Sequence, residues 1–265
     1  MYAQSVGQGS IVMSATVNVP VGKSELKGDE LTTTRFISRN FYDFNVSSFS
    51  RGPSISPQVT YARPINDRLS VGVGASYQHF RGFQPRADLS SDYVPGDGIG
   101  GNVGANYKLT ETSALGADLA FRRYATDEIG GQPSFDAGNR FSGTARYLRR
   151  DGFTTIRVVA RYARWDESKF SYTNGAQQGQ VIPSHVMLLG GYKTRLTEKI
   201  DLSVRASGYR YAEAEAIQID TKTFGRAYVS PSFEVTEQIA VAPHGTATYG
   251  SYLGLGGGLR IEGEF

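Results

Sequence analysis

The chain has 265 residues, 39% of them hydrophobic, and its 28 basic and 25 acidic side chains give a formal net charge of +3. The absence of cysteine excludes disulfide frameworks, thiol chemistry and zinc–cysteine sites. The mean hydropathy is −0.33 and no long apolar run is present, which excludes a helical membrane protein but not one that crosses a membrane with alternating strands.

Segments in which apolar and polar residues alternate follow one another along the chain, and a period of two predicts β-strands. We predict twelve strands, at residues 10–20, 54–64, 68–80, 98–109, 113–125, 139–149, 153–166, 184–195, 199–211, 224–235, 238–248 and 253–265. The segment 21–53 is interpreted as a long first loop. Alternatively it contains a further hairpin, which would raise the number of strands to fourteen.

The connections between these strands are alternately short and long. Short polar turns lie at residues 63–68, 109–112, 149–152, 196–199 and 235–238, and longer stretches rich in Gly, Asp, Ser and Asn lie between them. Short turns at one end and long loops at the other are typical of the periplasmic and extracellular ends of a membrane barrel.

Aromatic residues form two predicted belts on the apolar positions of the strands. The belt before the short turns consists of Tyr61, Tyr107, Tyr147, Tyr192 and Phe233. The belt at the far ends consists of Tyr77, Phe121, Tyr162, Tyr209 or Tyr211, and Tyr249. Because rings gather at both interfaces of transmembrane barrels, the two belts favour a membrane barrel over a soluble sandwich.

The last segment alternates for about a dozen residues, longer than the usual globular strand of about 5–6 residues, and ends on Phe265. It resembles the closing strand of bacterial outer-membrane β-barrels, whose terminal Phe is recognised by the barrel-assembly machinery. The resemblance implies an all-β, antiparallel, up-and-down and porin-like transmembrane barrel, with residues 1–265 as one domain. It also implies a place in the outer membrane, among lipid and lipopolysaccharide, with both termini periplasmic and 21–53 extracellular.

The remaining positions of each strand are predicted to face the lumen. They are small and polar at 68–80 and 98–109, and basic on later strands. The predicted anion-binding side chains of the lumen are Arg122, Arg140, Arg146, Arg157, Arg161, Arg205 and Arg226. Hairpin register places Asp118 across from Arg146, and Arg146 across from Arg157, to within about two residues.

Two interpretations of this lumen remain. In one, Asp118 and water bridge the arginines and the interior is filled, as in many small barrels. In the other, arginines left available select small anionic solutes by bidentate contacts, and inward glycines favour this second interpretation. The sequence therefore predicts a passive channel for small anions. The alternative is a non-conducting barrel that anchors or scaffolds other envelope proteins.

Other chemistry is less well supported. His79, His185 and His244 lie on separate strands without metal-ligand spacing, so no metal site or cofactor is expected. His79 lies near the rim, where outer-membrane phospholipases place catalytic groups, but no Ser follows two residues on, which makes a lipid-modifying enzyme the least favoured function. We expect no enzymatic activity. The basic residues form no stripe on a helix, so we expect no nucleic-acid partner.

Overall fold

The computed structural model describes residues 1–19, 27, 52–84, 91–172, 175–179, 183–213, 220–236, 238–250 and 253–263. All regular secondary structure in these ranges is β-strand, and the strands run antiparallel to their neighbours. Within the same ranges no helix is long and apolar enough to cross a membrane. The predicted all-β, antiparallel class is confirmed.

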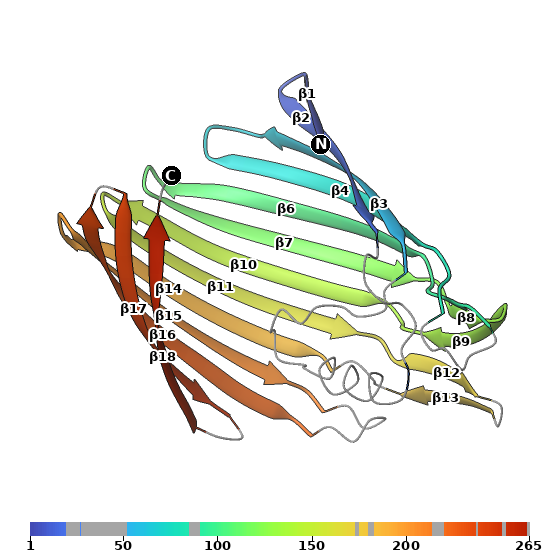
Figure 1. Ribbon diagram of the computed structural model, residues 1–265. Coiled ribbons are helices and arrows are strands. Elements are labelled where there is room, and N and C mark those ends of the chain that lie inside the picture. The colour runs from blue at the N-terminus through green and yellow to red at the C-terminus, as the bar shows by residue number, and fades with distance from the viewer. Residues whose placement is uncertain are drawn as a thin grey trace.

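One sheet of 13 strands makes up most of the molecule, and each strand pairs with its neighbour along the chain or across a long loop (Figure 1). Its strands are β1 (Tyr2–Val6), β2 (Gly9–Asn18), β3 (Ser54–Pro64), β4 (Leu69–Phe80), β6 (Gly98–Thr110), β7 (Ser113–Tyr124), β10 (Arg140–Asp151), β11 (Thr154–Trp165), β14 (His185–Thr197), β15 (Ile200–Tyr211), β16 (Lys222–Thr236), β17 (Ile239–Tyr249) and β18 (Leu253–Gly263). Every predicted strand is present, with ends within two residues of the prediction; the predicted end of the last strand, Phe265, lies outside the described residues. The thirteenth strand, β1, was not predicted.

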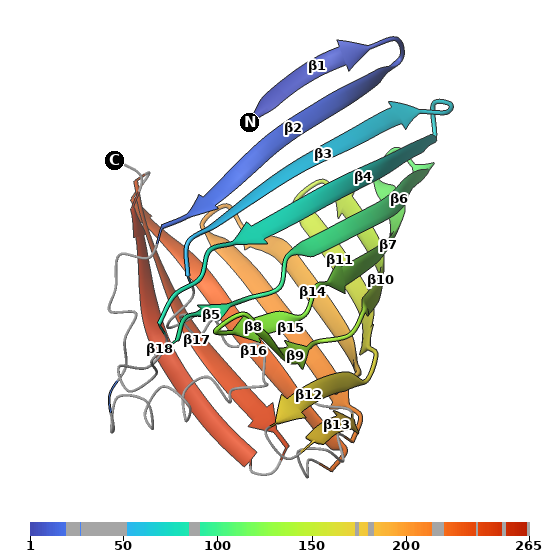
Figure 2. The ribbon, with the colours of Figure 1, turned by 90° about the vertical axis from the view of Figure 1, so that its right-hand side faces the viewer.

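The sheet is strongly curved and open on one side. Its edge strands are β1 and β18, and no pairing joins them in the described ranges. Figure 2 shows the open side between the β1–β2 hairpin and β18. The structure therefore differs from the predicted closed barrel of twelve strands, because β1 pairs with the β2 edge that a closing strand would need. The alternative of fourteen strands depends on residues 21–53, nearly all of which lie outside the described residues.

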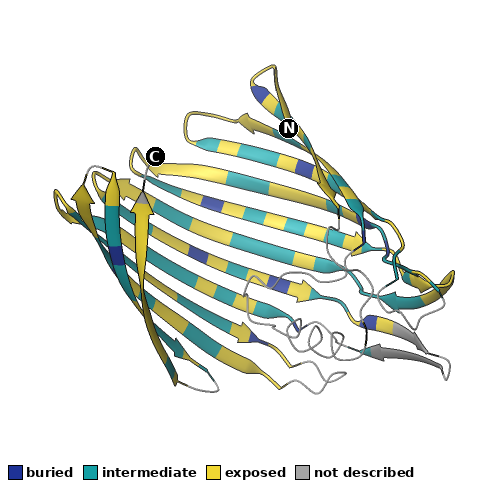
Figure 3. Ribbon diagram, in the orientation of Figure 1, coloured by how far each residue is buried: buried dark blue, intermediate teal, exposed yellow. Residues whose placement is uncertain are grey.

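The two faces of the sheet differ in chemistry. The face that carries Val73, Leu119 and Leu188, here the apolar face, leaves these side chains 55%, 64% and 56% exposed. The opposite face, here the polar face, carries the buried side chains of the sheet, which are Val159, Ala163, Tyr211, Ser230 and Ala242. Exposed and more covered residues alternate most clearly along β4 and β7 (Figure 3). The polar face is thus the concave side, where neighbouring side chains converge.

Three of the short turns share one local design. In the turns after β6, β14 and β16, the hydroxyl of Thr110, Thr197 or Thr236 accepts a hydrogen bond from the amide two residues on, at 3.3 Å in each case. The strand register shifts immediately before each of these threonines. Because a hydroxyl can replace a backbone acceptor in a tight turn, the repeated Thr-Glu pair in the sequence fixes both the turn and the bulge beside it.

A second sheet of five strands lies at the long-loop end (Figure 2). It is formed by β5 (Tyr93–Val94), β8 (Asp127–Ile129), β9 (Gln132–Asp136), β12 (Ser168–Tyr172) and β13 (Gly175–Gly179). Gly130 and Gly131 join β8 to β9 with φ angles of 58° and 76°, as a two-residue hairpin of type I′ requires. The long connections, in which the sequence predicted no strand, therefore contain short strands that pair with one another across three connections.

The predicted aromatic belts are present with one correction. Tyr61, Tyr107 and Tyr192 pair with apolar-face residues of neighbouring strands, and so do the rings of the far belt on β4, β7 and β11. Tyr209 and Tyr211, however, lie opposite Met187 and His185 on the polar face. The outward residue at this height of β15 is Arg210, so the prediction was wrong for this strand.

Candidate functional site

The seven arginines predicted to line a lumen all lie on the polar face, on strands β7 to β16. Cross-strand partners fix this placement: Arg122 lies opposite Arg140, and Arg161 opposite Thr144. Further round the sheet, Arg205 lies opposite Tyr228 and Arg226 opposite Ser207. The arginines therefore occupy one wall, and their anion-binding role stays a prediction.

Within the described residues, Arg146 is the member of this set that forms an ion pair. Its Nη2 lies 3.0 Å from Asp118 Oδ2 and donates a longer hydrogen bond of 3.4 Å to Asn106 Oδ1. Two glycines make room for the pair, because a Cβ on Gly116 would lie 2.4 Å from Arg146 Nε and a Cβ on Gly104 would lie 2.4 Å from Asp118 Oδ1. The predicted proximity of Asp118 and Arg146 is confirmed.

Arg146 and Arg157 are diagonal neighbours rather than directly opposite. The register pairs Arg146 with Val159 and Arg157 with Leu148, an offset at the limit of the predicted uncertainty. Diagonal positions place Cβ atoms about 7–8 Å apart, compared with about 4.5–5.5 Å for residues directly across. The offset therefore lowers the repulsion between the two guanidinium groups without requiring a ligand between them.

A gap flanked by two arginines lies further along the wall. Gly191 on β14 pairs with Arg157 on one side and Arg205 on the other. A Cβ on Gly191 would meet only the Arg157 carbonyl oxygen, at 3.9 Å, so no side chain fills the space between the arginines. The Arg205 guanidinium carbon lies 5.8 Å from the centre of the Tyr228 ring. Arg157 and Arg205 are both exposed, and within the described ranges neither pairs with an acidic side chain.

Charges at the short-turn end are balanced instead. Asp201 accepts contacts from Lys193 Nζ at 3.3 Å and Arg195 Nε at 3.4 Å. On the edge strand, Arg260 Nε lies 3.0 Å from Glu262 Oε1. These residues border a polar cavity of about 760 Å³. The excess positive charge of the polar face therefore lies in the middle and at the long-loop end, since acids near the short turns neutralise the bases there.

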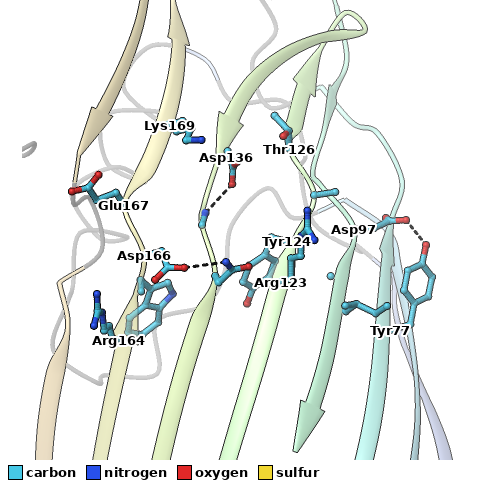
Figure 4. Close-up of a pocket in the computed structure, with 16 residues that line it drawn as sticks. Tyr77, Asp97, Arg123, Tyr124, Thr126, Asp136, Arg164, Asp166, Glu167 and Lys169 are labelled. Atoms are coloured by element: carbon cyan, nitrogen blue, oxygen red, sulfur yellow. Dashed lines mark hydrogen bonds between the residues drawn. The ribbon is translucent and has the colours of Figure 1, made fainter.

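A second polar cavity, of about 770 Å³, lies at the long-loop end (Figure 4). Arg123 and Arg164 enter it from the apolar face, and Lys169 of β12 also lines it. The acidic groups that line it are Asp97, Asp136, Asp166 and Glu167. Asn139 Nδ2 donates to Asp166 Oδ2 at 3.0 Å. No cluster of three metal-ligating side chains is found in the described part of the chain. The mixed charge makes this cavity a poorer anion site than the arginine wall.

Asp97 organises the rim of that cavity. Its carboxylate accepts hydrogen bonds from Tyr77 Oη and the Phe80 amide and lies 3.0 Å from His79 Nδ1. Burial raises the pKa of Asp97, but the bonds from Tyr77, His79 and Phe80 together outweigh burial and hold the pKa below its ordinary value. His79 is thus a rim residue tied to a carboxylate. Sequence reasoning missed Asp97 because a long loop separates it from β4.

A row of rings on the polar face was also missed. The ring centre of Trp165 lies 5.7 Å from that of His185, which lies 5.0 Å from Tyr211, and Tyr211 stacks on Phe224 at 5.8 Å. At its start, the Arg140 guanidinium carbon lies 4.6 Å from the centre of the Trp165 ring. The sequence offered one clue, since these residues sit at the loop ends of consecutive strands, but their common face depended on the register.

The fold matches solved structures. Over 97% of its length the chain superposes on the ferric enterobactin receptor PfeA of Pseudomonas aeruginosa, with a TM-score of 0.64, 9% identity and 42% of that chain covered. The fold is that of an outer-membrane β-barrel wall. The siderophore receptor PirA of P. aeruginosa matches 96% of the chain with a TM-score of 0.54 and 12% identity, over 39% of its own length.

PirA of Acinetobacter baumannii matches 82% of the chain with a TM-score of 0.58 and 10% identity, again over 39% of its own length. The chain thus spans about two fifths of the receptors that it matches. No family model and no curated protein sequence matches it. At these identities the likeness concerns the fold alone.

Proposed function

We propose that the chain forms a transmembrane β-barrel in the outer membrane of a Gram-negative envelope, with both termini periplasmic, and that its lumen passes small anionic solutes. The observation that carries the proposal is the arginine wall, because six of its seven members have no acidic partner among the described residues. Arginine forks bind carboxylate, sulfate and phosphate oxygens in pairs, so available guanidinium groups favour anions over cations.

The apolar face supports a membrane position. Its aliphatic residues stay exposed across the whole width of the sheet, and rings flank them toward both ends. In water, exposed apolar area on this scale marks an interaction surface. Against lipid it is the normal outer surface of a barrel, with the polar face turned inward.

Strand directions support closure into twelve strands. β2 runs from the short-turn end to the long-loop end, and β18 runs back, so the two edges would pair antiparallel like all other neighbours. In a bilayer, unpaired backbone groups of edge strands cost several kcal/mol each, which strongly favours closure. For this pairing β1 must leave the edge of β2. The barrel would then have an even number of strands, as single-chain bacterial barrels do.

The solved neighbours do not identify the solute. They are described as receptors for ferric enterobactin or for siderophores, and the chain covers about two fifths of each. A scaffold that conducts nothing is the alternative. It predicts that the arginine wall is neutralised by water or by a bound partner, whereas the channel predicts that these charges act on passing ions.

Charge variants measured in planar bilayers test the channel. Replacing Arg157 and Arg205 with Gln removes two positive charges without leaving an acid unpaired, unlike replacement of Arg146. We expect the anion preference measured from reversal potentials to fall. The matched control replaces Arg164 and Arg210, which lie on the apolar face, with Gln and should leave selectivity unchanged. Equal selectivity in both double variants would refute the proposed role of the wall.

A further inference from the structure

Two arginines face each other directly at the long-loop end of the polar face. Arg122, near the end of β7, and Arg140, the first residue of β10, are register partners. Residues directly opposite have Cβ atoms about 4.5–5.5 Å apart, and like charges at such positions repel. Elsewhere on the wall, neighbouring arginines are offset diagonally or separated by Gly191. Of the seven arginines, Arg122 and Arg140 are therefore the two that lie directly opposite each other on adjacent strands.

The two side chains lean away from one another. A Cβ placed on Gly100 of β6 would lie 3.5 Å from Arg122 Nε, so Arg122 extends over this glycine. Arg140 extends in the opposite direction, with its guanidinium carbon 4.6 Å from the centre of the Trp165 ring on β11. Below them, Ala120 and Ser142 form the next register pair, and both are small. The two guanidinium groups therefore lie on either side of the β7–β10 register pair, with small residues below it.

Neither arginine is neutralised within the described residues. The carboxylate nearest along β7 on the same face is Asp118, which Arg146 already engages at 3.0 Å. Arg140 Nε is buried and has no hydrogen-bond acceptor in the part of the chain that the structure describes. The contact with the Trp165 ring holds the Arg140 side chain in place. Since a buried unpaired donor is costly, a ligand that offers oxygen acceptors would be favoured there.

We propose that Arg122 and Arg140 bind one doubly charged oxyanion, of the sulfate or phosphate-monoester class, between them at the mouth of the barrel. Two guanidinium forks offer several N–H donors, and tetrahedral oxyanions accept such paired bonds. A dianion gains attraction from both arginines and cancels their mutual repulsion, whereas a monovalent ion neutralises only one of them. The proposal rests on the proposed function in one respect, that the polar face lines a water-filled lumen.

The chain contains a built-in reporter for this site. Trp165 is its single tryptophan, so the intrinsic indole fluorescence of the whole protein reports on the ring that contacts Arg140. When an anion draws the Arg140 guanidinium toward Arg122, the cation leaves the ring and the emission of Trp165 changes. Binding is therefore measured on the full chain in detergent, without any conductance.

The experiment titrates sulfate, inorganic phosphate and acetate against Trp165 fluorescence at constant ionic strength. We expect a saturable change with sulfate and phosphate but not with acetate. Arg122→Gln should weaken sulfate binding about tenfold or more, and Arg122→Lys, which keeps the charge but lacks the fork, should also weaken it. The matched control is Arg123→Gln, whose side chain lies on the opposite face of the same strand and which should bind like wild type.

Heat-modifiable gel migration of each variant checks that it is folded. The site is refuted if wild type shows no saturable change, if acetate acts as strongly as sulfate, or if Arg122→Gln and Arg123→Gln bind equally. Anion-selective conductance without a sulfate response would remove this site and leave the proposed function intact. A sulfate response in a protein that conducts nothing would keep the site and refute the channel.

Discussion

Closure of the sheet can be tested with cysteines, because the chain contains none of its own. In the structure β1 pairs with residues 9–13 of the ten-residue strand β2, which leaves residues 14–18 of this edge unpaired. Replacement of β1 by β18 would therefore add up to five residue pairs. At about 0.5–1.5 kcal/mol of net stabilisation for each hydrogen bond, the gain is about 3–7 kcal/mol, and it is larger in lipid.

The assay combines Ala15→Cys on β2 with one cysteine at each of five apolar-face positions of β18 in turn. These positions are Leu253, Leu255, Gly257, Leu259 and Ile261. A disulfide needs Cα atoms about 4.4–6.8 Å apart, so only a paired strand can form one. We expect one or two of the five pairs to cross-link in membrane-inserted protein.

The control is the pair Tyr2→Cys and Met13→Cys, which are register partners in the β1–β2 hairpin. Oxidation of this pair before membrane insertion should hold β1 on β2 and abolish both closure and conductance. Complete cross-linking of the control in inserted, conducting protein, with no cross-link at any β18 position, would refute the reasoning.

Four further predictions concern folding and the rim. Purified protein should give circular dichroism dominated by strand and heat-modifiable gel migration, and a largely helical spectrum in detergent would contradict the fold. Gly116→Ala should lower stability by about 1–3 kcal/mol, because its Cβ would lie 2.4 Å from Arg146 Nε, whereas Gly191→Ala on the same face should change stability little in the same denaturation assay. Because the pKa of Asp97 is lowered in the folded protein, the ionised carboxylate stabilises the fold above the ordinary carboxyl pKa, and this stabilisation is lost as the pH falls through the folded pKa. Asp97→Asn should therefore reduce the acid dependence of the melting temperature below about pH 4. His79→Ala should leave the protein without phospholipid hydrolysis, as wild type, and hydrolysis that disappears in this variant would revive the enzyme hypothesis.

Strand positions and faces were predictable because both depend on local alternation. A shift of one residue would turn every side chain to the wrong face, so alternation fixes the face as well as the strand. Tyr209 and Tyr211 were placed on the wrong face. The apolar positions at this end of β15 hold Gly208 and Arg210, and the prediction gave the belt position to a neighbouring ring instead of to a small or charged residue. At this strand end the register, not composition, decided the face.

Features that depend on contacts between distant segments were not predictable. β1 is a five-residue strand without clear alternation and is defined by its pairing with β2. The loop-end sheet requires three separate long connections to align. Likewise, the seven arginines could be assigned to one face from the sequence, but only the register distinguishes the direct pair Arg122 and Arg140 from diagonal neighbours.

The reversal potential of the wild-type protein in a planar bilayer with a salt gradient tests the central claim most directly. We predict a reversal potential whose sign shows that anions pass more readily than cations. The preference should weaken as salt rises, because the Debye length falls from about 10 Å at 0.1 M to about 3 Å at 1 M. Cation preference, or the absence of conductance in correctly inserted protein, would contradict the account of the arginine wall as the lining of an open pore.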